Sequence, residues 1–177
     1  MTRPKVLFIG GALNQTKIAH AVARELEGEV DAWFSPFYMD AGFVGALDRA
    51  SLLEWTALGG AFREASLTYL ADHGLAVDEG GCRNNYDVVV TGSDLVVQKN
   101  IRRKPLVLLQ EGMTDPENAM YHLVRTFRLP RYLASTASFG MSHAYDYLCA
   151  ASEGYQEHFV GKGIPAEKTV VTGLPHW

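Results

Sequence analysis

Short apolar runs, each followed by glycine or small polar residues, recur along the chain. The runs are 5–9, 30–34, 75–77, 87–91, 106–110, 145–150 and 168–172. Strands of a parallel sheet have this continuous apolar pattern because helices cover both faces of the sheet. The pattern therefore predicts about seven short strands in a mostly parallel sheet.

Segments with helical periodicity alternate with these runs. Apolar residues recur three or four positions apart after Thr16, and Asn14 or Thr16 is placed to cap that helix. Further helices are predicted over 48–58, over 61–73, after Pro116 and after Ser152-Glu153. The alternation predicts one Rossmann-like α/β domain of three layers over residues 1–177. An α/β barrel is disfavoured, because eight strand–helix units need roughly 250 residues.

The composition is that of a folded domain with a sizeable core. The chain has 177 residues, of which 47% are hydrophobic and 20% are charged, and domains commonly have roughly 100–200 residues. The start leads directly into the first apolar run, so no signal peptide is predicted, and no run approaches the roughly 18–20 residues of a membrane span. Cys82 and Cys149 form no close motif, which favours free thiols in a reducing cytoplasm and no metal site.

Charge is distributed unevenly along the chain. The net charge is −4, yet residues 99–131 carry seven Lys and Arg against three Asp and Glu. An acidic chain with one basic segment does not have the composition of a nucleic-acid-binding protein. Four basic or titratable side chains recur at every third position there: His122, Arg125, Arg128 and Arg131. Arg125 and Arg128 belong either to an ordinary solvated helix face or to a surface that meets phosphate, sugar or lipid headgroups.

Small and polar residues follow several of the predicted strands. The carboxyl ends of parallel strands meet at one edge, where open α/β sheets bind their ligands, so these residues are candidates for a binding site. The candidates are Gly10, Gly11, Asn14, Gln15 and Thr16 after the first run, Gly92, Ser93 and Asp94 after the fourth, and Glu111 and Gly112 after the fifth.

Two of these loops also have purely structural interpretations. Gly10–Thr16 opens a helix whose N–H groups favour an anion or a polar oxygen, but it matches neither G-x-G-x-x-G nor a Walker motif. It is either a tight strand-to-helix turn or a loop that contacts substrate. Gly92-Ser93-Asp94 is compatible with a helix N-cap and an acidic first turn, or with ligand contact.

Glu111 is the candidate for a catalytic group. It comes directly after an apolar strand, where partial burial raises the pKa of a carboxyl group toward the range useful to a general base. The structural alternative is a glutamate that caps the loop or pairs with a nearby arginine. The chain has no G-x-S-x-G elbow that would indicate a serine nucleophile.

Four segments of the second half form an ordered series of strands, turns and a helix. They are 106–112 (LVLLQEG), 145–152 (YDYLCAAS), 154–165 (GYQEHFVGKGIP) and 168–175 (KTVVTGLP). This series resembles the second half of the amino-terminal domain of GT-B-fold enzymes. These enzymes include glycosyltransferases, the non-hydrolysing UDP-N-acetylglucosamine 2-epimerases and CDP-glycerol glycerophosphotransferases. The opening, 6–11, is similar to the first strand and glycine loop of that fold.

The resemblance implies a function as well as a fold. In GT-B enzymes the first domain binds mainly the acceptor, and a second Rossmann domain binds most of the nucleotide-activated donor. The sequence ends where the linker between the domains would begin. The resemblance thus implies a missing carboxyl-terminal domain, a first half that is inactive alone and binds no cofactor, and a parent that uses a UDP-sugar or similar donor. The implied acceptor is a sugar or an anionic lipid or polymer, with peripheral contact at the inner face of the membrane.

The chain departs from each family after the strand at 106–110. The epimerases' H-x-E-A-G retains only Glu111 and Gly112, with Gln110 in place of histidine. In the glycerophosphotransferases' W-H-G-T, Glu111 replaces the histidine. Where some glycosyltransferases have a histidine in the first glycine loop, this chain has Asn14 or Gln15. The resemblance implies an acceptor-side role for Glu111 in a glycosyltransferase, with an epimerase half, a glycerophosphotransferase half or a non-catalytic binding domain as alternatives.

Overall fold

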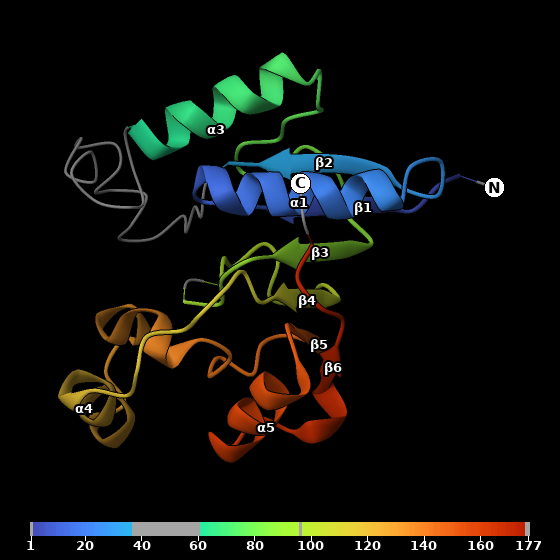
Figure 1. Ribbon diagram of the computed structural model, residues 1–177. Helices are drawn as coiled ribbons and strands as arrows, with labels where there is room; N and C mark the ends of the chain where they lie inside the picture. Colours follow the sequence, from blue (N-terminus) through green and yellow to red (C-terminus); the bar gives the residue numbers. More distant parts are fainter. Residues whose placement is uncertain (1, 37–60, 96, 176–177) are drawn as a thin grey trace.

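The computed structural model describes residues 2–36, 61–95 and 97–175, and its centre is one parallel β-sheet (Figure 1). The strands are β1 (Lys5–Ile9), β2 (Asp31–Ser35), β3 (Val88–Thr91), β4 (Leu106–Leu109), β5 (Tyr147–Ala150) and β6 (Thr169–Val171). They lie in the order β2-β1-β3-β4-β5-β6, and every neighbouring pair is parallel. The predicted α/β class with a parallel sheet is confirmed, and the layout is compatible with a Rossmann-like domain.

The prediction of about seven strands is too high by one for the described residues. The run 75–77 makes only an isolated parallel bridge, in which Val77 pairs with Phe34 on the outer side of β2. Asp78 N–H still donates to the carbonyl of Phe34 (2.9 Å), but the carbonyl of Asp78 then accepts from Gly81 N–H (3.1 Å). The chain therefore turns away at Asp78, before a ladder can form.

Helices and short 3-10 turns connect the strands. They are α1 (Leu13–Glu25), α3 (Ala61–Asp72), α4 (Ala119–Phe127), η1 (Arg131–Ser138), α5 (Glu153–Gly161) and η2 (Ala166–Lys168). The helices predicted over 61–73 and after Ser152 are confirmed, and Ser152 Oγ caps α5 by accepting from Tyr155 N–H (3.3 Å). The helix predicted over 48–58 lies outside the described residues.

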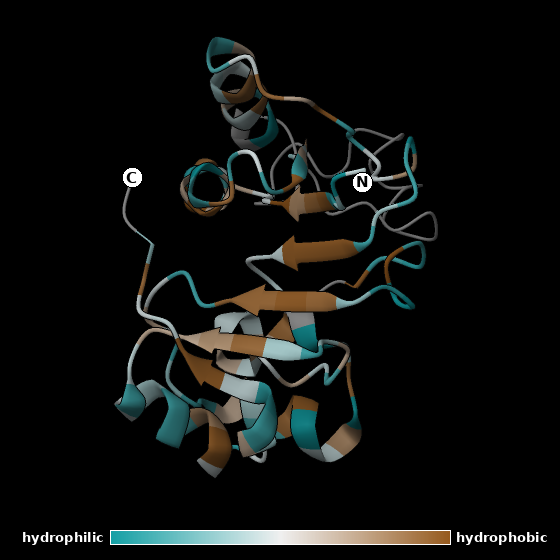
Figure 2. Cartoon of the chain, turned by 90° about the vertical axis from the view of Figure 1, so that its right-hand side faces the viewer, coloured by the Kyte–Doolittle hydropathy of each residue, from teal (hydrophilic) through white to brown (hydrophobic). Residues whose placement is uncertain are grey.

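Alternate residues of the strands enter two separate cores, one on each face of the sheet. On β1, Leu7 and Ile9 belong to the core that includes Phe159 of α5. Phe8 lies in the other core, with Ile18 of α1. The strands appear as a brown apolar layer in Figure 2. This two-sided burial explains why the strand sequences are apolar throughout rather than alternating.

The segment after Pro116 forms a shorter helix than its pattern predicts. α4 ends at Phe127, and Arg128 follows in the left-handed conformation with φ 52°. Leu129 and Pro130 come next, and a proline disfavours helical geometry at the residue before it, here Leu129. Arg131 therefore begins η1 instead of continuing α4. The four side chains that recur at every third position are therefore not all on one helix, since Arg128 lies at the C-cap of α4 and Arg131 in η1.

The strand order places three loops at the carboxyl edge of the sheet. β1 pairs with β2 on one side and with β3 on the other, so connections leave it in opposite directions. Such a switch point is where open α/β sheets bind ligands. Ile9 is in register with Thr91, and Thr91 with Leu108. Gly10 and Gly92 therefore leave adjacent strands, while Gln110 and Glu111 follow a strand that extends one residue further.

Candidate functional site

The loop after β1 holds α1 close against the sheet. Gly10 is buried, and a Cβ atom at this position would lie 2.9 Å from the backbone N of Thr16. That approach is closer than real Cβ atoms make, so the turn requires glycine. Thr16 is buried, and its hydroxyl donates to the carbonyl of Ala12 (3.1 Å). Gly10 and Thr16 therefore have a demonstrable packing role at the start of α1.

Gln15 caps the N-terminus of α1. Its Oε1 accepts from the N–H groups of Gly11 (2.6 Å) and Ala12 (3.1 Å). The N-cap residue is Ala12, which has no side-chain acceptor. Asn14 is exposed, and the Thr16 hydroxyl is a donor within the helix. The expectation that Asn14 or Thr16 caps this helix is wrong, because the glutamine in the first turn reaches back to the free N–H groups.

Glu111 extends from the end of β4 back across β3 to α1. Its Oε1 accepts a hydrogen bond from Nε2 of Gln15 at 2.5 Å. A Cβ atom on Gly92 would lie 2.5 Å from the same oxygen, so the carboxylate passes directly over this glycine. The structure thus brings together Gln15, Gly92 and Glu111, three of the sequence-predicted candidates, which follow three different strands.

The hydrogen bonds fix the orientation of the Gln15 amide. Two backbone N–H groups at Gly11 and Ala12 require an acceptor, so they must face the carbonyl oxygen of Gln15. The NH₂ group is then directed at Glu111. The helix N-terminus, the amide and the carboxylate form one chain of donors and acceptors. Glu111 enters that chain through Oε1.

The environment makes Glu111 a carboxyl group that titrates near neutrality. Burial raises its pKa to about 7, and the hydrogen bond from Gln15 opposes that rise. A group with this pKa is present in both protonation states at neutral pH, so it can accept a proton from a hydroxyl and release it again. The alternative was that Glu111 pairs with an arginine. In the described residues its carboxylate accepts instead from the neutral amide of Gln15.

Replacing Gln15 with methionine is expected to raise the pKa of Glu111 by about one further unit. Methionine fills a similar volume but donates no hydrogen bond, so the carboxylate loses a stabilising donor. Gln15→Glu should raise the pKa more, since two carboxylates then compete for one site. Carbon-13 NMR titration of the glutamate carboxyl carbons measures both shifts. Asn14→Ala, at an exposed position in the same turn, should leave the titration unchanged; a shift there would contradict the assignment.

Gln110 fastens the loop after β4 to the end of β5. The side chain is 2% exposed, its Nε2 donates to the carbonyl of Gly112 (2.8 Å), and its Oε1 accepts from Ala151 N–H (2.8 Å). Gly112 is partly buried and has open space where a Cβ would project. Gln110 supports the candidate site by fixing the backbone on both sides of Glu111.

Asp94 is a buried structural acceptor rather than a helix cap. Its side chain is fully buried, with Oδ1 accepting from Gly140 N–H (2.9 Å) and Oδ2 from Ser142 N–H (2.8 Å). Ser93 lies in a turn in which its carbonyl accepts from the Thr91 hydroxyl (3.0 Å). The described residues between 92 and 105 contain no helix. The N-cap interpretation of Gly92-Ser93-Asp94 is therefore wrong.

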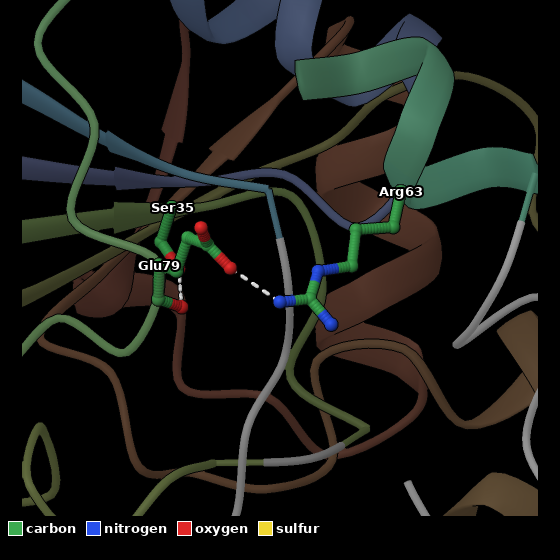
Figure 3. Close-up of polar contacts among 3 residues, drawn as sticks. All are labelled: Ser35, Arg63 and Glu79. Atoms are coloured by element: carbon green, nitrogen blue, oxygen red, sulfur yellow. Dashed lines mark hydrogen bonds and ion pairs between the residues drawn. The ribbon is translucent and has the colours of Figure 1, made fainter. Parts of the chain in front are cut away.

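A second polar cluster lies at the carboxyl end of β2 (Figure 3). The buried Ser35 donates from Oγ to the carbonyl of Glu79 (2.8 Å), and the Glu79 carboxylate forms an ion pair with Arg63 of α3. These contacts tie α3 to the loop that follows Val77. The sequence prediction missed this cluster. Ser35 follows the same rule that identified the other candidates, because it is a polar residue directly after an apolar run.

Arg125 and Arg128 do not join the Glu111 cluster. Arg125 lies in the last turn of α4 and Arg128 at its C-cap, and both are exposed. Glu111 instead follows β4 and contacts Gln15 in the first turn of α1. Within the described ranges, no group of three or more His, Cys, Asp and Glu side chains is arranged to hold a metal ion.

Comparison of the chain with family models, curated proteins and solved structures found no match.

Proposed function

We propose that the chain is the acceptor-binding domain of a nucleotide-sugar-dependent glycosyltransferase of the GT-B type. The observation that carries the proposal is the Glu111 carboxylate, held across Gly92 by the oriented amide of Gln15 at the carboxyl edge of a parallel sheet. Acceptor binding at this edge agrees with the place where open α/β sheets bind ligands. A second domain, carboxyl-terminal to this one, would bind the donor.

In the proposed reaction Glu111 acts as general base toward the acceptor. It takes the proton of an acceptor hydroxyl while the hydroxyl oxygen attacks the anomeric carbon of the donor sugar. The bond between that carbon and the phosphate oxygen breaks, and the nucleoside diphosphate leaves with the bonding electrons. A pKa of about 7 suits this step, because a base works best when its pKa lies near the working pH.

Gln15 and Gly92 support the same step without touching the reacting atoms. Gln15 holds one oxygen of Glu111, and in the proposal the other oxygen takes the proton of the acceptor hydroxyl. Gly92 leaves the space in which the carboxylate lies. A precisely held base is needed because misplacement of a reacting group by about 1 Å can cost roughly a hundredfold in rate.

Glu111→Gln tests the proposal in the natural polypeptide that contains residues 1–177. Transfer is assayed with UDP-sugars as donors and with saccharide, polyol and lipid-linked acceptors. The variant is expected to lower kcat by about 10²–10⁴, the usual contribution of general acid–base catalysis. In the unsubstituted protein the rate should rise with pH through about 7 and then level off, because the deprotonated form of Glu111 is the active one.

Glu153→Gln is the matched control. Glu153 is an exposed glutamate just past the end of β5, and its substitution should leave kcat within about twofold, as surface changes usually do. The proposal fails if Glu111→Gln transfers sugar at the normal rate. Epimerised UDP-N-acetylglucosamine as the product, or transfer from CDP-glycerol only, would assign the domain to one of the alternative reactions. Transfer by residues 1–177 alone would contradict a separate donor domain.

A further inference from the structure

Large apolar side chains are exposed together on α4 and the turns that follow it. The exposed fractions are 42% for Met120, 44% for Leu123, 66% for Phe127, 40% for Leu129 and 46% for Leu133. All five lie within residues 120–133. Scattered apolar residues are normal on a protein surface, but a large exposed apolar patch usually marks an interaction site. No helix among the described residues has the length and apolar composition that a membrane span requires.

The apolar side of α4 is wider than its contact with the rest of the chain. Tyr121 and Val124 are buried and form a small cluster with Ala134 and Ala137 of η1. Met120, Leu123 and Phe127 occupy positions i, i+3 and i+7, which form a second stripe next to the buried one. This second stripe is the part left exposed, so α4 has two apolar faces and η1 covers one of them.

The charge of the same segment is entirely basic. Residues 119–133 contain Arg125, Arg128, Arg131 and one histidine but no Asp or Glu, in a chain whose net charge is −4. Arg125 and Arg128 are exposed beside the apolar stripe. A short helix with exposed Phe and Leu and flanking arginines is the pattern of segments that lie in the interface of anionic membranes.

We propose that this segment is a docking surface for an anionic lipid membrane. The α4 surface is defined by Met120, Leu123, Phe127, Leu129 and Leu133 together with Arg125 and Arg128. Its apolar side chains enter the boundary between headgroups and acyl chains, and the two arginines bind lipid phosphates. A second copy of the chain is a poorer occupant, because a twofold contact through this surface would bring the arginines of both copies into one interface, to which residues 119–133 contribute no acidic partner.

The position of the α4 surface relates it to the candidate site. In Figure 1, α4 lies on the side to which the arrowheads of β2 and β3 point, and this is the carboxyl edge that carries Glu111. Docking would therefore bring that edge toward the membrane. If the proposed function holds, the acceptor is a hydroxyl carried by a lipid at the membrane surface. Membrane binding itself does not depend on that function and is measured without it.

Vesicle co-sedimentation of the 177-residue chain tests the proposal. The probes are vesicles of phosphatidylcholine with about 30% phosphatidylglycerol and vesicles of phosphatidylcholine alone, at about 0.1 M salt. The chain is expected to bind the anionic vesicles at least tenfold more tightly, and the binding should weaken with salt. Leu123→Ser with Phe127→Ser should reduce binding at least tenfold, and Arg125→Gln with Arg128→Gln at least fivefold.

Two matched variants separate the α4 surface from general effects of charge and hydrophobicity. Lys99→Gln with Arg103→Gln removes two exposed positive charges from another loop, and Val160→Ser removes an exposed apolar residue from α5. Both should bind within about twofold of the unsubstituted chain. Equal losses in these controls, or no binding to anionic vesicles, would overturn the proposal. Dimers in sedimentation velocity that Phe127→Ser dissociates would instead assign the surface to a contact between copies.

Discussion

Replacing Asp94 with alanine is expected to lower the free energy of unfolding by about 2–5 kcal/mol. The carboxylate is fully buried and accepts from two backbone N–H groups, at Gly140 (2.9 Å) and Ser142 (2.8 Å). Alanine leaves both donors without this partner, and a buried donor that loses its acceptor costs about 1–3 kcal/mol. The loop that Asp94 holds also packs tightly, since a Cβ on Gly140 would lie 2.5 Å from Ile164.

Urea unfolding measures the loss, and Asp87→Ala is the control. Asp87 also accepts a backbone N–H bond, from Lys5 (2.8 Å), but the pair is exposed, so water can replace the lost acceptor. We expect a change below about 1 kcal/mol there. Asp94→Asn keeps one acceptor oxygen and should lie between the two. If Asp94→Ala lowers the free energy of unfolding no more than Asp87→Ala does, burial of the Asp94 carboxylate does not determine how much it stabilises the fold.

Glu111→Gln is expected to stabilise the domain at alkaline pH and to leave it unchanged in acid. Burial raises the pKa of Glu111 in the folded chain from 4.5 to about 7, so the folded state binds the proton more tightly than the unfolded state does. Its contribution to stability is complete below about pH 4.5 and is lost as pH rises through about 7. Glutamine has the same shape and cannot ionise, so the variant does not suffer this loss.

The expected difference is about 1–3 kcal/mol at pH 8.5, because each pKa unit corresponds to about 1.4 kcal/mol. Unfolding by urea at several pH values between about 4.5 and 8.5 shows whether the two curves converge in acid and separate in base. Glu153→Gln, at the exposed start of α5, should follow the unsubstituted protein throughout. Parallel curves for Glu111→Gln and the unsubstituted protein would mean that the carboxyl group is not desolvated by folding.

The strands of the fold were predictable because burial on both faces leaves a continuous apolar run, as in Val89 and Val90 of β3. The misses have local causes. Val77 pairs at one position only, since Asp78 starts a turn. α4 ends where Arg128 adopts a left-handed backbone conformation. Arginine, unlike glycine, does not indicate this conformation in a sequence. Periodicity indicates where a helix can form, but such turns are decided by the contacts around them.

The place of the candidate site in the fold was predictable, but the contacts between its side chains were not. The rule that polar residues gather at the ends of parallel strands selected Gln15, Gly92 and Glu111, which the structure brings together. The same rule included Asp94, whose carboxylate faces a distant loop instead. The pairing of Gln15 with Glu111 spans 96 residues. It depends on strand order and on the missing side chain at 92, neither of which a local pattern contains.

The close passage of Glu111 over Gly92 links positions that are far apart in the chain. Any side chain at 92 would take the space that the carboxylate occupies, and a shorter residue at 111 could not reach the amide of Gln15. A substitution at one of these three positions therefore changes what is tolerated at the other two. We therefore expect the three positions to vary together among relatives, because the arrangement needs all three residues at once.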